Sequence, residues 1–501
     1  MCGNLRWLAA TGLITLGLTC LAAAEPPASS EPITPERVNE VVRELANASS
    51  ERRLALLVLI REWSARKSDS RVDPLTLPSV LRNATLEIAK YADDPSPAIR
   101  AAVLTDLGRL RAPAPVARLV WKKGLEAGSP RDLTAIATGM LSYYDRAQEI
   151  RDPSSGSARL RLLELFADDV AGTLDLLPMV LRSSTPEARA SGWRALSALL
   201  DTLDDRQPEL SADQNPEAFA SFKRNLAPIG KQVAECLSLI TAQLPSADLD
   251  EQLLMLQAVM DAAEVCIARP ERDSRYRQPR GRLMRADLEP EGKQAADAIV
   301  VALRELIPAL DLVIISGSLE AKLALLSAIE DLGGEGQMVW KLLTHAARDP
   351  NRFVRWAAMR AMAKFSTDDL DRVLPVFARG LKDSDLGVRN ATCQTVEQFG
   401  KRAKALAPDL GKLLMSEDEE LTQNAMRALT AMGPDAAPAV PYLIQTLRSE
   451  NPKLRQLAPP LLGIIGKPAG QEAIPALMTA LDDPDPDVRL KAAEALRRLT
   501  D

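Results

Sequence analysis

The sequence of 501 residues contains a single histidine, His345. Histidine is a common zinc ligand and the general base of most nucleophile–base arrangements, so its scarcity counts against His-based metal sites and against such catalysis. No phosphate-binding glycine-rich loop and no CxxC pair is present either. The sequence therefore predicts a protein that is not an enzyme and has no metal site and no cofactor. We expect His345 to be structural, interacting with the C-terminal end of a helix.

Cysteine is also scarce. Two of the five cysteines, Cys2 and Cys20, lie in the first 24 residues, and the others are Cys236, Cys266 and Cys393. Such an odd, sparse set is not a disulfide framework. Cys236 and Cys266 fall on consecutive predicted helices, so a bridge between them is one alternative, and buried free thiols are the other.

Aromatic residues make up 4% of the chain although 46% of it is hydrophobic, which indicates a core of alanine and leucine on helices. No run has the period-two alternation of strands. The charge balance of 62 basic against 68 acidic residues gives −6, which argues against a dedicated nucleic-acid binder. Beyond the N-terminus, the most apolar stretch, 298–315, is interrupted by Arg304, Glu305 and Asp311, so we expect no transmembrane span in the mature chain.

The first 24 residues have the pattern of a signal peptide. Arg6 is followed by an uncharged apolar run from Trp7 to Leu21, and Ala22 to Ala24 form a small-residue cleavage site. We expect cleavage near Ala24, a Pro/Ser-rich linker over 25–34, and export to a bacterial periplasm or cell envelope. A lipoprotein with a lipid on Cys20 is an alternative, but Gly17 and Thr19 do not fit the usual lipobox.

The C-terminal third of the sequence is repetitive. Each repeat has a turn of Asp, Ser, Asn or Pro, an aliphatic–basic pair such as Val354–Arg355, and small apolar residues at helical spacing. The second residue of this pair recurs every 33 or 34 positions, at Arg355, Arg389, Thr422, Arg455 and Arg489. A period of this length, with two helices per unit, is typical of a helical solenoid.

Prolines give a second, independent marker of the same period. They stand near the start of an apolar helix in each unit, at Pro375, Pro408, Pro441 and Pro475. The following helix is expected to begin with a capping residue and a proline, as in Asn451–Pro452 and Asp485–Pro486. Each unit is therefore a helix pair, and its two apolar faces are buried only when units stack.

On these residues the chain resembles the HEAT and HEAT-like (phycobilisome-lyase-type) repeat family. The resemblance is specific over 349–501 and looser upstream, where Asp94 to Leu104 is again close to the phrase. It implies an all-α fold, a right-handed α-α superhelical solenoid of HEAT-like helix pairs. We expect irregular repeats over 35–315, with a polar loop at 201–216 and a basic loop at 269–293, and a regular array over 316–501.

The basic residues of the repeat phrase could form an anion-binding stripe, but the resemblance implies a structural ladder. In HEAT-like arrays the equivalent arginine stacks between repeats and pairs with the acidic turn residue, here Asp349, Asp383 or Asp483. We call these residues the ladder arginines: Arg100, Arg355, Arg389, Arg455 and Arg489.

The second helix of each pair lines the concave surface in the resembling family, and its exposed positions are the expected partner-binding residues. They are Trp356, Arg360, Asn390, Gln394, Gln423, Arg427 and Gln456. An indole beside amides and guanidinium groups suits protein recognition. Ordinary solvent-facing positions, with Trp356 packed on a neighbouring helix, are the alternative.

The basic loop differs in composition from the rest of the chain. Its arginines are Arg272, Arg275, Arg277, Arg280, Arg282 and Arg285. The loop is either a solvated insertion or a docking element for an acidic partner, an anionic polymer or a membrane surface.

These features together predict an exported, non-catalytic scaffold or adaptor that binds an unknown protein or peptide. Two alternatives stay open. One is an enzyme accessory or lyase-like HEAT protein, and the other is binding of nucleic acid or another anionic polymer through basic surfaces.

Overall fold

The computed structural model describes residues 33–65, 76–146, 156–203, 215–266, 283, 288–332, 334–335, 339–363, 365–366 and 370–500. The chain divides into two compact units, at 1–112 and 113–501, and each is described by itself. The signal peptide, most of the linker, all six predicted arginines of the basic loop and residues 204–214 of the polar loop lie outside the described residues.

The first unit is a small helical bundle. Its elements are α1 (Pro35–Asn47), α2 (Ser50–Ala65), α3 (Thr76–Ile88), the 3₁₀ helix η1 (Ala89–Tyr91) and α4 (Pro97–Arg109). Thr34 caps α1 by accepting a hydrogen bond from the Arg37 amide at 3.3 Å, and Pro35 occupies the first turn. Apolar side chains spaced along the helices, including Leu45, Ile60 and Val103, form one buried core.

The second unit begins with longer and less regular helices. They are α5 (Ala114–Ala127), α6 (Pro130–Tyr144), α8 (Gly156–Ala171), η2 (Leu174–Leu176), α9 (Leu177–Leu181), α10 (Pro186–Leu203), α11 (Pro216–Gln243), α12 (Leu249–Cys266), α13 (Glu291–Ser316) and α14 (Leu319–Leu332). The polar loop is thus shorter than expected, because α10 continues to Leu203 and α11 begins at Pro216.

The second unit continues in shorter helix pairs. They are α15 (Trp340–Ala346), α16 (Arg352–Met362), α17 (Leu370–Gly380), α18 (Leu386–Phe399), α19 (Ala407–Leu413), α20 (Glu419–Met432), α21 (Val440–Leu447), α22 (Pro452–Ile465), α23 (Gly470–Ala480) and α24 (Pro486–Thr500). Short 3₁₀ helices precede three of the first helices: η5 (Gly400–Leu406), η6 (Gly433–Ala439) and η7 (Lys467–Ala469).

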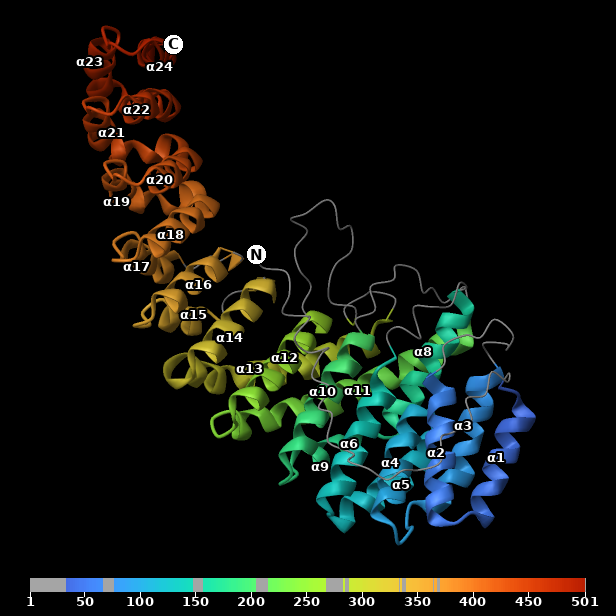
Figure 1. The fold of residues 1–501 in the computed structure, drawn as a ribbon. Coiled ribbons are helices and arrows are strands. Elements are labelled where there is room, and N and C mark those ends of the chain that lie inside the picture. Colours follow the sequence, from blue (N-terminus) through green and yellow to red (C-terminus); the bar gives the residue numbers. More distant parts are fainter. Residues whose placement is uncertain are drawn as a thin grey trace. The chain divides into compact units, whose positions relative to one another are not determined.

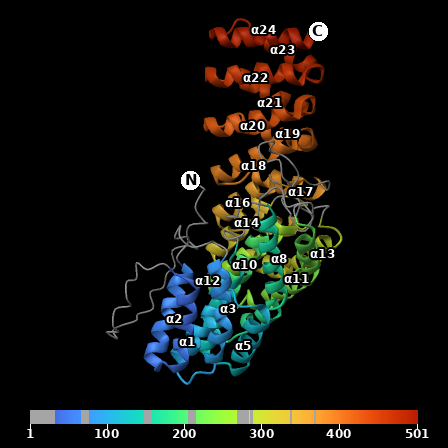
Figure 2. The same cartoon turned by 90° about the vertical axis from the view of Figure 1, so that its right-hand side faces the viewer.

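These helices form two layers. Helices α10, α12, α14, α16, α18, α20, α22 and α24 pack in sequence order in one layer, while α8, α11, α13 and α15, and further on α19, α21 and α23, follow one another in the other. Figure 1 shows this succession of pairs, and in Figure 2 the helices α18, α20, α22 and α24 lie one above another with α19, α21 and α23 beside them. The predicted all-α solenoid of helix pairs is confirmed.

The expected helix starts are largely confirmed. Asn451 caps α22 by accepting from the Lys453 amide at 3.0 Å, and Pro408 and Pro441 stand in the first turns of α19 and α21. Pro375 and Pro475 instead lie inside α17 and α23, which begin five residues before each proline, at Leu370 and Gly470. There the chain enters the helix one turn earlier than in the other pairs.

Two features were not expected from the sequence. Strands β1 (Gly334–Glu335) and β2 (Phe365–Ser366) form a parallel two-residue pairing after α14 and α16, too short for a period-two pattern. The chain divides into its two compact units after Ala112, a boundary that the sequence did not suggest, and α12 to α16 pack in continuous succession across residue 315. No described helix is long and apolar enough to span a membrane.

Candidate functional site

The turns between paired helices are fixed by their acidic residue. Asp349, Asp383 and Asp483 each accept a hydrogen bond from the amide two residues on, at 2.8, 2.9 and 2.9 Å. This local bond is the Asx-turn that aspartate favours. The second carboxylate oxygen takes no part in the turn bond, and in Asp383 and Asp483 an arginine of the preceding repeat binds it together with the first.

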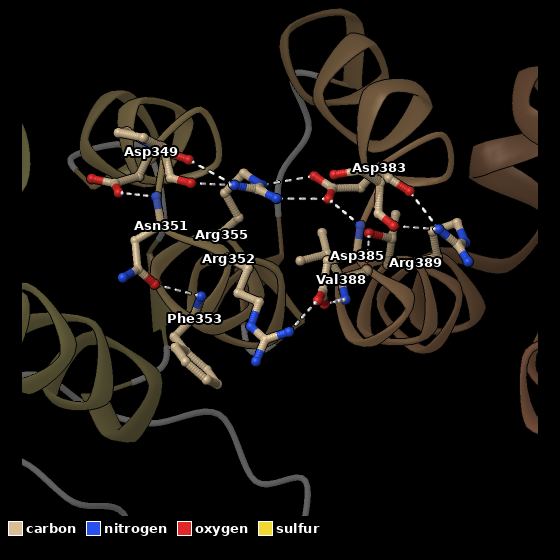
Figure 3. A network of polar contacts seen from close by, with 12 residues as sticks. Asp349, Asn351, Arg352, Phe353, Arg355, Asp383, Asp385, Val388 and Arg389 are labelled. Carbon is tan, nitrogen blue, oxygen red and sulfur yellow. Dashed lines mark hydrogen bonds and ion pairs between the residues drawn. The ribbon is translucent and has the colours of Figure 1, made fainter.

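Arg355 shows how a ladder arginine uses this oxygen. Its Nη1 donates to the carbonyls of Asp349 and Pro350 at 3.0 and 2.9 Å, within its own repeat. Its Nε and Nη2 donate to the two carboxylate oxygens of Asp383, in the next repeat, at 2.7 and 2.8 Å. Figure 3 shows the guanidinium of Arg355 between the two turns. The bidentate pair clamps neighbouring repeats together.

The same clamp recurs along the chain. Arg455 donates from Nε and Nη2 to Asp483 at 2.8 and 3.0 Å, and from Nη1 to the carbonyls of Ser449 and Glu450. Lys322 takes this role toward Asp349 at 2.7 Å, and Arg189 takes it toward Glu251 at 2.6 and 2.8 Å. In the first unit, Arg53 pairs with Asp94 at 2.8 Å.

Two further ladder arginines, Arg389 and Arg489, bond only their own turn, through Nη1, among the contacts that the structure gives. Arg389 donates to the carbonyls of Asp383 and Ser384 at 2.6 and 3.1 Å, and Arg489 donates to those of Asp483 and Pro484. Arg100 similarly donates to Asp94 and Pro95. For Arg389 the expectation of an acidic partner is wrong, because the next turn carries Ser416 in place of aspartate.

The ladder is interrupted over two consecutive repeats. Ser416 and Ser449 stand at the aspartate position, and Thr422 stands at the arginine position between them. Thr422 bonds only carbonyls of its own turn, those of Ser416 and Asp418. No ion pair of the ladder type therefore joins α18 to the α19–α20 turn, or α20 to the α21–α22 turn, within the described part of the chain.

Trp356 and Arg360 lie together on α16. Trp356 is 36% exposed, and the guanidinium carbon of Arg360 lies 4.7 Å from the centroid of its ring. Arg360 also pairs with Glu330 of α14 at 2.6 Å. The ion pair and the cation–π contact hold the arginine over the indole without covering the whole ring.

Asn390 is not a surface residue, and its expected exposure is wrong. It is 7% exposed, and its side-chain oxygen accepts from Asn424 Nδ2 at 2.8 Å, which joins α18 to α20. Arg427 in turn donates to Asn424 Oδ1. The two amides satisfy each other because both lie between packed helices, where an unpaired amide is costly.

The remaining positions of the predicted row are spread over three helices. Gln394, Gln423 and Arg427 are exposed, while Gln456 is half-buried. Gln423 bonds Glu419, and Gln456 donates to Asp485 at 3.0 Å. The structure therefore brings these amides and Arg427 into local contacts within the array, and gathers no single cluster around Trp356.

Phe353, which was not among the expected residues, is 50% exposed and lies one turn before Trp356 on α16. Leu386, the first residue of α18, is 37% exposed, and a Cβ on the adjacent Gly387 would lie 3.7 Å from the Trp356 ring. We call Phe353, Trp356 and Leu386 the aromatic surface. The sequence could have indicated this surface, because no other repeat has a large apolar residue at the Phe353 position. The equivalent residues are Gly387, Glu420, Lys453 and Asp487.

An open groove lies at the turn between α15 and α16. It has a volume of about 410 Å³ and is lined by Leu319, Lys322, Asp349, Pro350, Asn351 and Val354. Its two charged residues neutralise each other in the Lys322–Asp349 pair. The groove therefore offers a mainly apolar recess at the start of α16.

The cysteines and the histidine are structural. Cys236, Cys266 and Cys393 are free and buried, so the two consecutive ones do not form the bridge that was one alternative. Burial raises the pKa of all three thiols, that of Cys393 to about 12, which suppresses the reactive thiolate. His345 lies in the last turn of α15, near the helix C-terminus as expected, and its Nδ1 also bonds Asp311 of α13 at 2.7 Å.

The comparisons with known proteins identify the repeat type. A family model described as HEAT repeats matches residues 339–429 and 407–497. The two matches together span 159 of the 501 residues, from 339 to 497, so this part of the chain is similar to HEAT repeats. No curated protein matches the sequence.

Solved structures of low identity align over most of the chain. A chain from work on a phosphorylation switch in the interaction between cadherin and β-catenin is 14% identical, with 93% of this chain and 95% of that chain covered and a TM-score of 0.42. Kap121p bound to the SUMO protease Ulp1p is 15% identical, with 94% and 50% covered and a TM-score of 0.42. This chain spans about half the length of Kap121p.

Proposed function

We propose that the chain is a non-catalytic scaffold that binds a protein partner through the aromatic surface on α16 and α18. One observation carries this proposal. Among the tryptophan and phenylalanine side chains that the structure describes, only Phe353 and Trp356 are exposed. They lie one helical turn apart on the same face, although only 4% of the chain is aromatic.

The local charges favour binding at these rings. The guanidinium carbons of Arg352 and Arg360 lie 4.8 and 4.7 Å from the centroids of Phe353 and Trp356. Each arginine is held from its other side by a carboxylate, Asp385 at 3.4 Å or Glu330 at 2.6 Å. Rings fixed in this way lose little conformational entropy when a partner covers them. Tryptophan and arginine are also the residues that most often dominate protein interfaces.

The groove at the start of α16 supplies a place for a partner side chain. The raised pKa of the buried thiols counts against the lyase-like alternative, because covalent transfer would need an accessible thiolate. No observation favours nucleic-acid binding over protein binding.

The test compares capture of partners by three forms of the full chain in extracts of its native host. A Phe353→Ser/Trp356→Ser variant should lose the proteins that the wild type retains. A Leu490→Ser variant should retain them, since Leu490 is 60% exposed on α24, away from the aromatic surface. Quantitative mass spectrometry reads out the capture. Equal capture by the wild type and the double variant would show that this surface is not the binding site.

We further propose that the protein is exported to a bacterial periplasm or cell envelope, on the basis of the apolar run before Ala22 to Ala24. N-terminal sequencing of the protein from its host should give a start at or near Glu25. Recovery of Met1, or a lipid on Cys20, would contradict simple cleavage. The basic loop stays a proposed second contact for an anionic partner.

A further inference from the structure

Arg389 has a guanidinium group that is positioned like those of Arg355 and Arg455 but makes only half as many hydrogen bonds. In all three, Nη1 donates to two carbonyls of the residue's own turn, at 2.6 to 3.1 Å. These bonds fix the plane and direction of the group. In Figure 3 the side chain of Arg389 stands beyond Asp383, bonded to that turn.

The remaining edge of the guanidinium, formed by Nε and Nη2, is where the residues differ. In Arg355 and Arg455 it binds both oxygens of an aspartate in the following repeat, at 2.7 to 3.0 Å. In Arg389 this edge meets no acceptor among the residues that the structure describes. Ser416 stands at the aspartate position, and its hydroxyl accepts only the turn amide of Asp418, at 3.2 Å.

We propose that the open edge of Arg389 binds a carboxylate of the partner, from an Asp or Glu that lies next to an apolar residue. This inference rests on the proposed function and names the partner's chemistry. A fork of two N–H groups fits a planar group with two oxygens, and carboxylates occupy the equivalent place in two other repeats. The Arg389 turn bonds pre-orient the fork, which lowers the entropic cost of binding.

The surroundings specify the second part of the motif. Leu386 precedes Arg389 by three residues on α18, so the two lie on one face of the helix, and Leu386 belongs to the aromatic surface. The two acids of the Arg389 turn are already paired, since Asp383 binds Arg355 and Asp385 binds Arg352. An acidic side chain that reaches Arg389 therefore does not compete with these two carboxylates, and it has an apolar contact one helical turn away.

Two substitutions in the full chain isolate this site. Ser416→Asp returns the chain's own carboxylate to the ladder position, so it should raise the melting temperature and close the edge to other carboxylates. Arg389→Gln removes the fork. Each has a matched control: Ser449→Asp adds the same charge opposite Thr422, which has no fork, and Arg489→Gln removes an arginine with the same turn bonds at the end of the array.

The probe is a displayed library of random 12-residue peptides, selected on the wild-type chain, with affinities then measured by fluorescence anisotropy. Selected peptides should share an Asp or Glu beside an aliphatic or aromatic residue. Their affinity should fall about tenfold or more on the Arg389→Gln and Ser416→Asp variants, and less than about twofold on both controls.

Three results would overturn the inference: no selected peptide with an acidic residue, equal affinity for the wild type and both test variants, or no rise in melting temperature with Ser416→Asp. Peptides that depend on Phe353 and Trp356 but not on Arg389 would leave the proposed function standing and remove this inference alone. Peptides that depend on neither site would remove both.

Discussion

At the scale of single residues, the ladder arginines Arg455 and Arg389 differ in one contact. Arg455 and Arg389 bond two carbonyls of their own turns in the same way, but only Arg455 also holds a carboxylate, that of Asp483. The side chains of Arg455 and Asp483 are 13% and 9% exposed, so water screens this pair less than it would a surface pair. Comparing Arg455 with Arg389 therefore isolates the contribution of the inter-repeat ion pair to stability.

The first prediction compares the same substitution at both positions. Arg455→Gln should lower the free energy of unfolding by about 1.5–3 kcal/mol more than Arg389→Gln, because only the former leaves a largely buried carboxylate without its charged donor. Urea denaturation of the two variants and the wild type at pH 7 measures the difference. Equal losses would show that the turn carbonyls, and not the inter-repeat pair, carry the effect.

The second prediction concerns pH. The hydrogen bond from Arg455 is the main cause that holds the pKa of Asp483 below its ordinary value. A carboxyl with a depressed pKa in the folded state stabilises the fold above its unfolded pKa of about 3.9, and this contribution is lost as pH falls through the folded pKa. The stability gap between the Arg455→Gln and Arg389→Gln variants should therefore shrink below about pH 4.

Denaturation curves at several pH values, from 7 down to the lowest pH at which the chain is still folded, would check this trend. Asp483→Asn is the control, because the asparagine cannot ionise and its stability should lack the same acid-dependent change. A gap that stays constant with pH would mean that Asp483 is not the titrating partner.

At the scale of helices, Gly230 marks a close approach between α11 and α13 in the irregular part of the second unit. A Cβ on Gly230 of α11 would lie 2.4 Å from the Cα and 2.7 Å from the carbonyl oxygen of Ala295 on α13. These are backbone atoms that cannot rotate away. Helices α11 and α13, of 28 and 26 residues and the two longest that the structure describes, therefore approach each other through a glycine and an alanine.

The third prediction follows from this contact. Gly230→Val should destabilise the chain by about 1–3 kcal/mol, because overpacking forces the helices apart. Gly470→Ala is the matched control: nothing lies within 4 Å of its Cβ position, so the change should be neutral or stabilising. Thermal unfolding followed by circular dichroism measures both. A neutral Gly230→Val variant would contradict the close packing of α11 and α13.

Much of the helix pattern could be predicted because its signals are local. The Val–Arg pairs and capping residues place the starts of α16, α18 and α24 at turns that the sequence marks. Burial of Asn390 could not be predicted, since it depends on Asn424 in the next repeat. The missing partner of Arg389 could have been predicted, because Ser416 stands where other repeats have aspartate. That prediction requires aligning the turns of the repeats and not only their helices. The strand pairing of Gly334 with Phe365 has no local signal.

At the scale of the whole array, the interrupted ladder divides the regular repeats into parts of different strength. Clamps join Lys322 to Asp349, Arg355 to Asp383 and Arg455 to Asp483, whereas Ser416, Thr422 and Ser449 provide none between α18 and α22. In a solenoid each repeat is stabilised mainly by its immediate neighbours. A weak joint in the middle therefore lowers the cost of opening there.

The fourth prediction is that amides of α20 exchange with solvent sooner than those of α16 and α18. Native-state hydrogen exchange read by mass spectrometry would show it. Ser416→Asp should slow exchange at α20, while Ser449→Asp, which faces Thr422, should not. Uniform exchange along the array would mean that packing alone sets repeat stability.

The buried amide pair between α18 and α20 has a consequence for how such an array can be rearranged by gene duplication. Asn424 donates to Asn390 at 2.8 Å, and this pairing is directional, from one repeat to the one before it. A tandem copy of the α19–α20 repeat alone would set the second Asn424 opposite Gln423, an exposed side chain in the present fold. A duplication that keeps this hydrogen bond must therefore copy the two repeats together. Buried contacts, and not only surface residues, thus constrain the order of the repeats.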